Sequence, residues 1–338
     1  MKSLLSASSM QLKTVALASA IFAVATAIET HGGYQFETRF SSDAAPETVD
    51  IKDPYEITAA QQAYARLHEQ VEATGIANQC LTEPTGTQPG DLYTLKDCIA
   101  ANNSRNFFTL LAEDIEDANS FWAQVVQEST TNRTQWVPAR AYTKGYFNGS
   151  LTATEFAAWT LSDNADSANL NANPEHYYKE TIVDATGAQQ SAIFEGWGGV
   201  LSTFGTKRTN FTVPAFATPV YGTVDTPEDW DIGPSFPLLF QRIGSKILVS
   251  EGLQTFGALH IAVRDFVASE GSTGESGIEI YSAVWYPPWD QASEADREEF
   301  TNNYLADEAH HMVVEVINLT LQAYQDCKSG LCVISATA

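Results

Sequence analysis

The chain is poor in basic residues and in long apolar runs. Its 338 residues include 18 Lys and Arg against 42 Asp and Glu, a formal net charge of −24. Charge of this sign argues against binding to nucleic acid or to anionic membrane surfaces. Beyond residue 27, no stretch approaches the roughly 18 apolar residues that a membrane-spanning helix needs. We therefore expect no nucleic-acid partner and no membrane span.

The short motifs of several enzyme classes are also missing. The sequence has no serine-nucleophile elbow, no Walker loop, no Rossmann glycine fingerprint and no internal repeat. The glycine run at 196–199 is not followed by a helix signal, so it does not indicate a phosphate loop. The four cysteines have no C-x-x-C spacing, which makes zinc and redox interpretations weak. We expect neither a metal ion nor another cofactor.

The N-terminus is typical of a secretory signal peptide. Lys2 and Lys13 provide a positive start, and the apolar run at 15–27 is short and ends in Ala-Thr-Ala. We expect a signal peptide over residues 1–27 and an exported chain that starts near Ile28. Loss of the two lysines would make that chain still more acidic. The acidity itself fits solubility in an acidic or extracellular medium.

Cysteines and sequons agree with the secretory pathway. Four cysteines allow three pairings, and we favour the two sequence-local bridges because each closes a short, loop-containing segment: Cys80–Cys98 and Cys327–Cys332. Five N-x-S/T sequons lack a middle proline and predict glycosylation sites at Asn102, Asn132, Asn148, Asn210 and Asn318.

Helices and strands are expected in different parts of the chain. Residues 28–52 have no clear period and suggest an irregular lead-in. Capping residues and apolar periodicity predict helices over 53–73, 92–103 and 105–128. Residues 157–173, rich in Asn, Asp, Ala and Ser, predict a loop. Strand-like runs follow at 175–183, 191–198, 237–249, 253–267 and 277–286. Two helices, at 293–305 and 307–326, are expected after the last strand.

This order predicts an α+β fold in which N-terminal helices precede a strongly bent antiparallel sheet that encloses a pocket. The two C-terminal helices follow the sheet. Gly257 lies within a long strand and predicts a bulge there. The expected organisation is a signal peptide (1–27), a lead-in with a helical extension (28–104), an α+β domain (105–326) and a C-terminal tail (327–338).

The strand at 253–267 has one face with the character of a pocket wall. Alternation places His260 and Arg264 on one face beside Phe256 and Phe266. Histidine exchanges protons near neutral pH, and arginine can anchor a carboxylate or stabilise an enolate. We therefore predict that His260 and Arg264 are catalytic. The alternative is a half-solvated strand with a hydrogen-bonded core histidine and an arginine that reaches the rim.

Four further residues are predicted to bind the substrate. If the strands at 253–267 and 277–286 form a hairpin, Tyr281 and Trp285 share a cavity with His260. Glu195 and Trp197 lie in a glycine-rich run, where backbone or ligand can approach closely. A bulged strand explains these glycines equally well.

A helical motif near the C-terminus has metal-ligand spacing. Glu308, His311 and Glu315 are at i, i+3 and i+7, an arrangement that recurs in metal-binding bundles. The apolar stripe of this helix lies on roughly the opposite side, so a helical wheel predicts that His311 faces water and that His310 lies at the edge of the stripe. We therefore expect no metal site here.

The element order and the last hairpin, GALHIAVRDF…GIEIYSAVWYPPW, resemble the ketosteroid-isomerase-like or SnoaL-like (NTF2-like) cone fold over roughly residues 105–326. The larger size, leader, sequons and cysteines are similar to those of secreted fungal cyclases that dimerise maleic anhydride units into maleidrides. The resemblance implies cofactor-free chemistry, in which a base removes a proton next to a conjugated carbonyl. In this scheme His260 is the base and Arg264 holds the anion.

Two functional hypotheses follow. The first is a secreted, cofactor-independent isomerase or cyclase that acts on a small conjugated carbonyl compound in secondary-metabolite biosynthesis. The alternative is a non-catalytic secreted glycoprotein that binds a small molecule or another surface. An anionic substrate would need a local cationic pocket in so acidic a chain. The sequence leaves the oligomeric state open.

Overall fold

The computed structural model describes residues 27–42, 45–47, 52–132, 135–160, 162–183, 189–196, 208–214, 241–250, 255–267 and 276–332. The predicted signal peptide therefore lies outside the described residues, apart from Ala27. No helix among the described residues is long and apolar enough to cross a membrane.

The described strands form a ten-stranded sheet whose neighbours are all antiparallel. Their order is β1-β2-β4-β10-β9-β8-β7-β6-β5, with β3 paired to β2. The strands are β1 (Ala27–His31), β2 (Tyr34–Ser42), β3 (Ala45–Glu47), β4 (Val137–Tyr146), β5 (His176–Val183), β6 (Gln189–Gly196), β7 (Arg208–Pro214), β8 (Gln241–Ser250), β9 (Thr255–Val267) and β10 (Ser276–Tyr286).

The predicted hairpin between the last two strands is confirmed. β9 and β10 pair without a break from Ser276 opposite Val267 to Trp285 opposite Ala258. β10 is rich in β-branched and aromatic residues and is buried on both faces, as expected of a central strand. The register between β8 and β9 shifts beside Gly257, where an added Cβ would lie 2.8 Å from Leu248 Cδ1. The predicted bulge is therefore present, and close packing explains the glycine.

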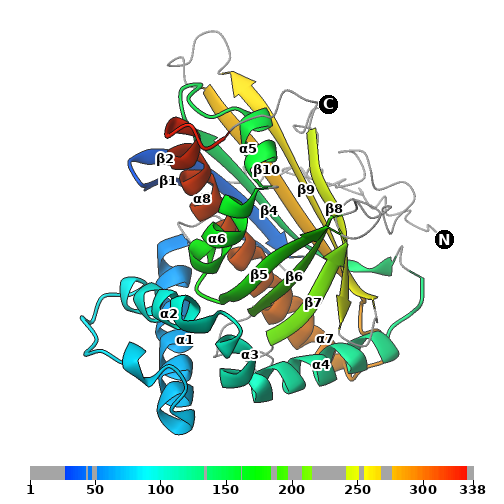
Figure 1. Ribbon diagram of the computed structural model, residues 1–338. Helices are drawn as coiled ribbons and strands as arrows, with labels where there is room; N and C mark the ends of the chain where they lie inside the picture. The colour runs from blue at the N-terminus through cyan, green and yellow to red at the C-terminus, as the bar shows by residue number, and fades with distance from the viewer. Residues whose placement is uncertain are drawn as a thin grey trace, which may run out of the picture.

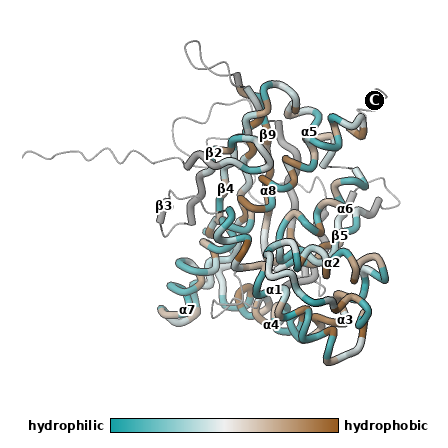
Figure 2. Tube along the Cα trace, turned by 90° about the vertical axis from the view of Figure 1, so that its left-hand side faces the viewer, coloured by the Kyte–Doolittle hydropathy of each residue, from teal (hydrophilic) through white to brown (hydrophobic). Residues whose placement is uncertain are grey.

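The helices are α1 (Lys52–Thr74), α2 (Gly90–Asn103), α3 (Asn106–Leu110), α4 (Ala112–Gln127), α5 (Ala153–Trp159), α6 (Asp163–Ala172), α7 (Glu294–Glu299) and α8 (Leu305–Lys328), with short helical turns at Asn78–Cys80 and Phe300–Tyr304. Figure 1 shows α8 running between the β4–β10–β9 part of the sheet and strands β5–β7. It also packs against α1, α5 and α6. α7, by contrast, has no buried residue and is drawn as mainly hydrophilic in Figure 2.

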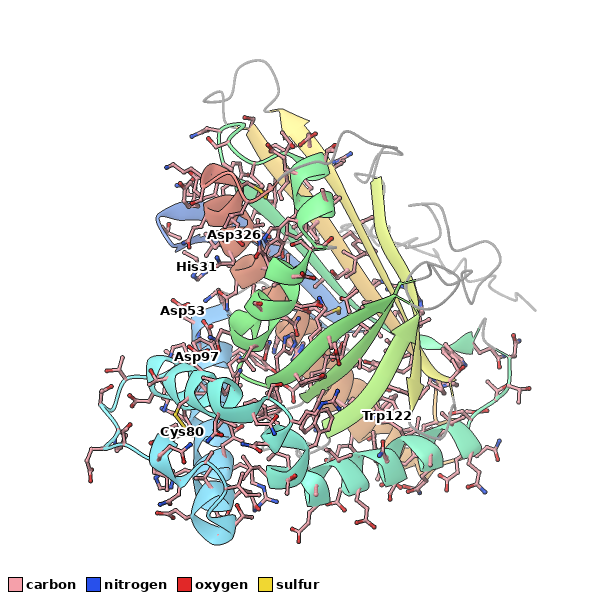
Figure 3. All side chains as sticks on the ribbon, in the orientation of Figure 1. His31, Asp53, Cys80, Asp97, Trp122 and Asp326 are labelled. Atoms are coloured by element: carbon pink, nitrogen blue, oxygen red, sulfur yellow. A yellow bond between two sulfur atoms is a disulfide. The ribbon has the colours of Figure 1, made fainter. Side chains whose placement is uncertain are left out.

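Two hydrophobic clusters hold these layers together. The larger one joins α8, α4 and α5 to the sheet, and in it the ring of Trp122 stacks on Tyr286 at a centroid distance of 4.8 Å. The smaller one joins α1, α2 and α3 to the β5–β6 hairpin through Tyr177 and Phe194. The labelled Trp122 and Cys80 mark these two regions in Figure 3.

The α+β class and most of the expected elements are confirmed, but three expectations are wrong. The predicted loop at 157–173 is mostly helix α6, which begins after the N-cap Ser162, whose hydroxyl accepts a hydrogen bond from the amide of Ala165. The predicted irregular lead-in contains β1 and β2, which extend the sheet beyond β4. β4 itself was not anticipated. Its partners β2 and β10 lie far away in sequence, so its pairing left no local signal.

Both predicted disulfides are present, between Cys80 and Cys98 and between Cys327 and Cys332. Three of the predicted glycosylation sites, Asn102, Asn132 and Asn148, are exposed. The side chain of Asn210 lies outside the described residues. Asn318 is different, because its Nδ2 donates hydrogen bonds to Glu56 (2.9 Å) and to the carbonyl oxygen of Ala172 (3.0 Å). A glycan on Nδ2 would displace both bonds, and glycosylation at all five positions stays a prediction.

Gly277 gives a direct test of the close approach between β10 and β4. A Cβ at this position would lie 1.9 Å from the carbonyl oxygen of Gly145, a backbone atom that cannot rotate away. We expect Gly277→Ala to lower the free energy of unfolding by about 2 kcal/mol or more, measured by urea denaturation. The control is Gly90→Ala at the start of α2, where nothing lies within 4 Å. Equal stability of the two variants would contradict the pairing.

Candidate functional site

Two buried histidines from distant parts of the chain meet beneath the sheet. His176 begins β5 and His311 lies on α8, and their Nε2 atoms are 2.9 Å apart. Their exposed fractions are 0% and 2%. Imidazoles removed from water in this way must form hydrogen bonds within the protein, because burying an unpaired polar atom costs free energy.

The surrounding acceptors determine which nitrogen carries hydrogen. Nδ1 of His176 is 2.9 Å from the carbonyl oxygen of Asn169, which can only accept, so this nitrogen donates. The Nε2 atom of a neutral His176 therefore has a lone pair and accepts from Nε2–H of His311. On the far side of the second ring, Nδ1 of His311 lies 3.9 Å from Oε2 of Glu175.

The segment before β5 holds the pair in place. Asn173 donates from Nδ2 to the carbonyl oxygen of His311 (3.1 Å) and accepts at Oδ1 from the amide of Glu175 (3.0 Å). The fully buried Lys96 donates to the carbonyl oxygens of Asn173 (3.0 Å) and Pro174 (3.3 Å). Burial holds the pKa of Lys96 well below its ordinary value, so the lysine is a hydrogen-bond donor here rather than a strong local charge.

Carboxylates surround the histidine pair. Oε2 of Glu195, on the neighbouring strand β6, lies 3.3 Å from Nε2 of His176. Glu315 is one helical turn beyond His311 on α8, and ligand atoms of His176, His311 and Glu315 all lie within 4.8 Å of one another. On the other side of His311, the buried Glu308 shares a hydrogen bond with Tyr286 of β10.

A small cavity opens beside these groups. Its volume is about 60 Å³, room for a few water molecules or for the reacting end of a small molecule. The lining residues are Asn169, Lys179, Ile193, Glu195, Leu248, Leu259, Ile261, Val284, Tyr286, Glu308, His311, Met312 and Glu315. Two larger hollows among the described residues, of about 360 and 320 Å³, have no histidine in their walls. Of these three, the small cavity combines an apolar wall with two histidine-pair neighbours, Glu195 and Glu315, and with His311 itself, groups able to move protons.

Burial and neighbouring charges shift the pKa values of the groups around the cavity in different directions. Burial and the neighbouring His311 hold the pKa of His176 well below its ordinary value. For His311, burial alone would lower the pKa, but the Glu175, Glu308 and Glu195 carboxylates raise it to about 9. Burial raises the pKa of Glu308 well above its ordinary value. A neutral imidazole thus faces a protonated one.

Of the predicted site residues whose side chains the structure describes, Glu195 lines this cavity, whereas Arg264, Tyr281 and Trp285 do not. Arg264, Tyr281 and Trp285 share one face of the β9–β10 hairpin, as predicted. The cavity lies against the opposite face, which carries Ile261 and Val284. Arg264 is paired there with Glu279 through two of its guanidinium nitrogens. The roles predicted for this face remain predictions.

The side chains of two predicted site residues, His260 and Trp197, lie outside the described residues. The backbone register sets His260 opposite Ala283 of β10 and Ser245 of β8, but its side chain lies outside the described residues. Trp197 lies outside the described residues altogether.

The prediction that His311 faces water is wrong, and Glu308, on the same side of the helix, is buried as well. Glu308 is 6% and His311 2% exposed, and Glu315 is half-buried. The helical wheel assumed that α8 has one buried stripe. In the structure this helix is covered by β4 and β2 on one side and approached by β5 and α1 on others, so its polar face is also inside.

His176, Glu175 and Lys96 were missed as site residues. Their sequence neighbourhoods contain no motif, and each contributes through a partner on another element. The nearest available signal was the spacing Glu308–His311–Glu315, which pointed to the correct helix face.

Comparisons with known proteins do not assign the chain to a family. No model of a protein family matches its sequence, and no curated protein matches it. The arrangement of side chains in the cavity therefore carries the functional argument.

Asp307, at the start of α8, gives a pH-dependent test of burial near this site. Burial, and then the charge of Glu175, raise its pKa from 3.8 to about 7. The folded state thus keeps this proton at a higher pH than the unfolded state does. The free energy of unfolding should therefore fall as the pH rises from about 4 to 7.

We expect Asp307→Asn to be more stable than the unmodified protein at pH 8, by on the order of 2 kcal/mol, and of similar stability at pH 4. Chemical denaturation at the two pH values measures this difference. Glu116→Gln, which removes one exposed negative charge from α4, is the matched control. A stability gain of Asp307→Asn that is the same at both pH values would exclude the buried carboxyl as the cause.

Proposed function

We propose that this protein is an acid–base isomerase or cyclase that acts on a small, neutral, conjugated carbonyl compound. The observation that carries the proposal is the buried His176–His311 pair, with Glu195 3.3 Å from Nε2 of His176 and on the wall of the cavity. The Glu195 carboxylate can accept a proton, and the protonated His311 of the same pair also lies on this wall, so a base and an acid meet in one place.

The proposed reaction begins with proton removal by Glu195. A C–H bond next to the carbonyl breaks, the proton moves to the carboxylate, and the electron pair moves onto the carbonyl oxygen. The positive charge of His311, on the same wall, would stabilise the resulting enolate oxygen in surroundings with little water, where such electrostatic stabilisation is strong. Return of the proton to another carbon gives an isomer, whereas attack of the enolate carbon on a second molecule gives a dimer or a ring.

The charge of the site supports a neutral substrate. The cavity is lined by three glutamates, Glu195, Glu308 and Glu315, within a chain of net charge −24. Its lysine, Lys179, is paired with Asp166 at 3.1 Å. A carboxylate substrate would meet repulsion at this surface, but a ketone, an enone or a cyclic anhydride would not.

This proposal keeps the reaction class implied by the resemblance to ketosteroid-isomerase-like proteins and moves the chemistry to another face of the sheet. It includes a pocket formed by the sheet around α8, in the manner of the cone fold. It also includes an exported, glycosylated protein in secondary-metabolite biosynthesis, with dimerisation of maleic anhydride units as the specific form of the reaction.

Complementation of a deletion strain can distinguish the two faces. We expect deletion of the gene to remove one metabolite, and the unmodified gene to restore it. The Glu195→Gln gene should restore at least about 100-fold less of this metabolite, because loss of a general base usually costs about this much in rate. The His260→Ala gene should restore the metabolite fully. Secretion of both variants at normal levels is the folding control.

The reverse pattern, with His260→Ala inactive and Glu195→Gln active, would reject the cavity as the site. An unchanged metabolite profile in the deletion strain would reject catalysis and favour the alternative of a non-catalytic binding protein.

A further inference from the structure

The same cavity has an excess of hydrogen-bond acceptors. Nε2 of His176 cannot carry hydrogen while this ring is neutral, because Nδ1 donates to Asn169, yet Oε2 of Glu195 faces it at 3.3 Å. Two acceptors at this distance repel each other unless a positive charge lies close to both.

Two oxygens in this wall lack hydrogen-bond donors in the part of the chain that the structure describes. Oε2 of Glu308 and Oδ1 of Asn169 have no hydrogen-bond partner among the described residues, although the two residues are only 6% and 4% exposed. Buried acceptors without donors are rare in folded proteins, and a bound ion with its water is one way in which they are satisfied. The cavity therefore has the polarity of a cation site.

We propose that His176, His311 and Glu315 bind one divalent transition-metal ion of the zinc class, with Glu195 beside it. Two imidazoles and one glutamate are the protein ligands of one class of catalytic zinc sites, which keep a further position open for water or substrate. Imidazole nitrogen favours zinc and its neighbours over magnesium or calcium. This inference replaces the sequence-based expectation that the protein has no cofactor.

The distance between the two histidines needs little adjustment. Ligand atoms of the three residues already lie within 4.8 Å of one another. Two nitrogens bound to one tetrahedral zinc ion at about 2.05 Å are roughly 3.3 Å apart, so the histidine pair, now 2.9 Å apart, needs to open by a few tenths of an ångström. The ion would take the place of the proton between the rings.

The surroundings of both histidines match those of metal ligands. A metal-bound histidine almost always donates its second N–H to a carbonyl or carboxylate oxygen, which sets the ring orientation. His176 does so to the carbonyl oxygen of Asn169, and His311 has Glu175 3.9 Å from its Nδ1. Glu175 is itself held by the hydroxyl of Tyr55 at 3.0 Å.

A metal ion here would strengthen the proposed reaction without being required by the geometry of proton transfer. It would polarise the carbonyl oxygen of the substrate, while Glu195 would still accept the proton. The metal site rests on the ligand geometry and not on the catalytic proposal.

Metal binding can be measured directly on the purified full chain. After treatment with a chelator, we expect titration with zinc to saturate at one ion per chain, as measured by elemental analysis after desalting. Cobalt(II) should give the visible absorption of a four- or five-coordinate site. Glu315→Gln, which keeps the shape of the side chain, should weaken zinc binding by about 100-fold or more, because loss of a ligand costs at least as much as loss of its support.

His68→Gln is the matched control. His68 and Glu72 form another i, i+4 histidine–glutamate pair, 3.6 Å apart on the surface of α1, without a second histidine opposite. This variant should bind zinc like the unmodified chain. Failure of the unmodified chain to retain zinc, or equal affinity of Glu315→Gln and the unmodified chain, would overturn the proposal.

The zinc X-ray absorption spectrum of the unmodified chain provides a test that needs no variant. Scattering from two imidazole rings is expected, and a shell of oxygen atoms alone would overturn the site. The two proposals can fail separately. A chain that forms the product but retains no zinc in the titration would reject the metal site and keep the enzyme, whereas one bound zinc ion without any product would do the reverse.

Discussion

The burial of α8 on several sides is the constraint on which the rest of the structure depends. A helix covered only by a sheet needs one apolar stripe, but α8 is also approached by β5, α1 and α6. Its polar residues are therefore inside the protein and must find partners there. His311 meets His176, Glu308 meets Tyr286, and Asn318 meets Glu56.

This demand for partners explains why the histidine pair is held so closely. Asn173 joins β5 to the backbone of α8, and Lys96 fixes the carbonyl oxygens of Asn173 and Pro174 from α2. The helical N-terminal region is thus part of the support of the site as well as a separate hydrophobic cluster. Groups whose neighbours are fixed in this way are suited to transfer protons or bind an ion with little rearrangement.

Much of the secondary structure could be predicted from local pattern. The caps and periodicity of α1, the β9–β10 hairpin and the two sequence-local disulfides all depend on residues close together in the chain. β1, β2 and β4 were missed, because what stabilises them is pairing with distant strands. The site was harder still. Glu195 was found through its glycine-rich surroundings, whereas His176 gave no local signal.

The sequence by itself determined the α+β class, the acidic surface and the alternation that puts Arg264, Tyr281 and Trp285 on one face of a hairpin. Only the tertiary structure decided which face of the hairpin meets α8, and therefore that the cavity is lined by Ile261 and Val284. The reason is physical. Alternation and helical periodicity report which residues lie together on one element, but the burial of a face depends on what packs against it. His311 on α8, for example, is buried because it meets His176 of β5, which lies 135 residues away in the chain.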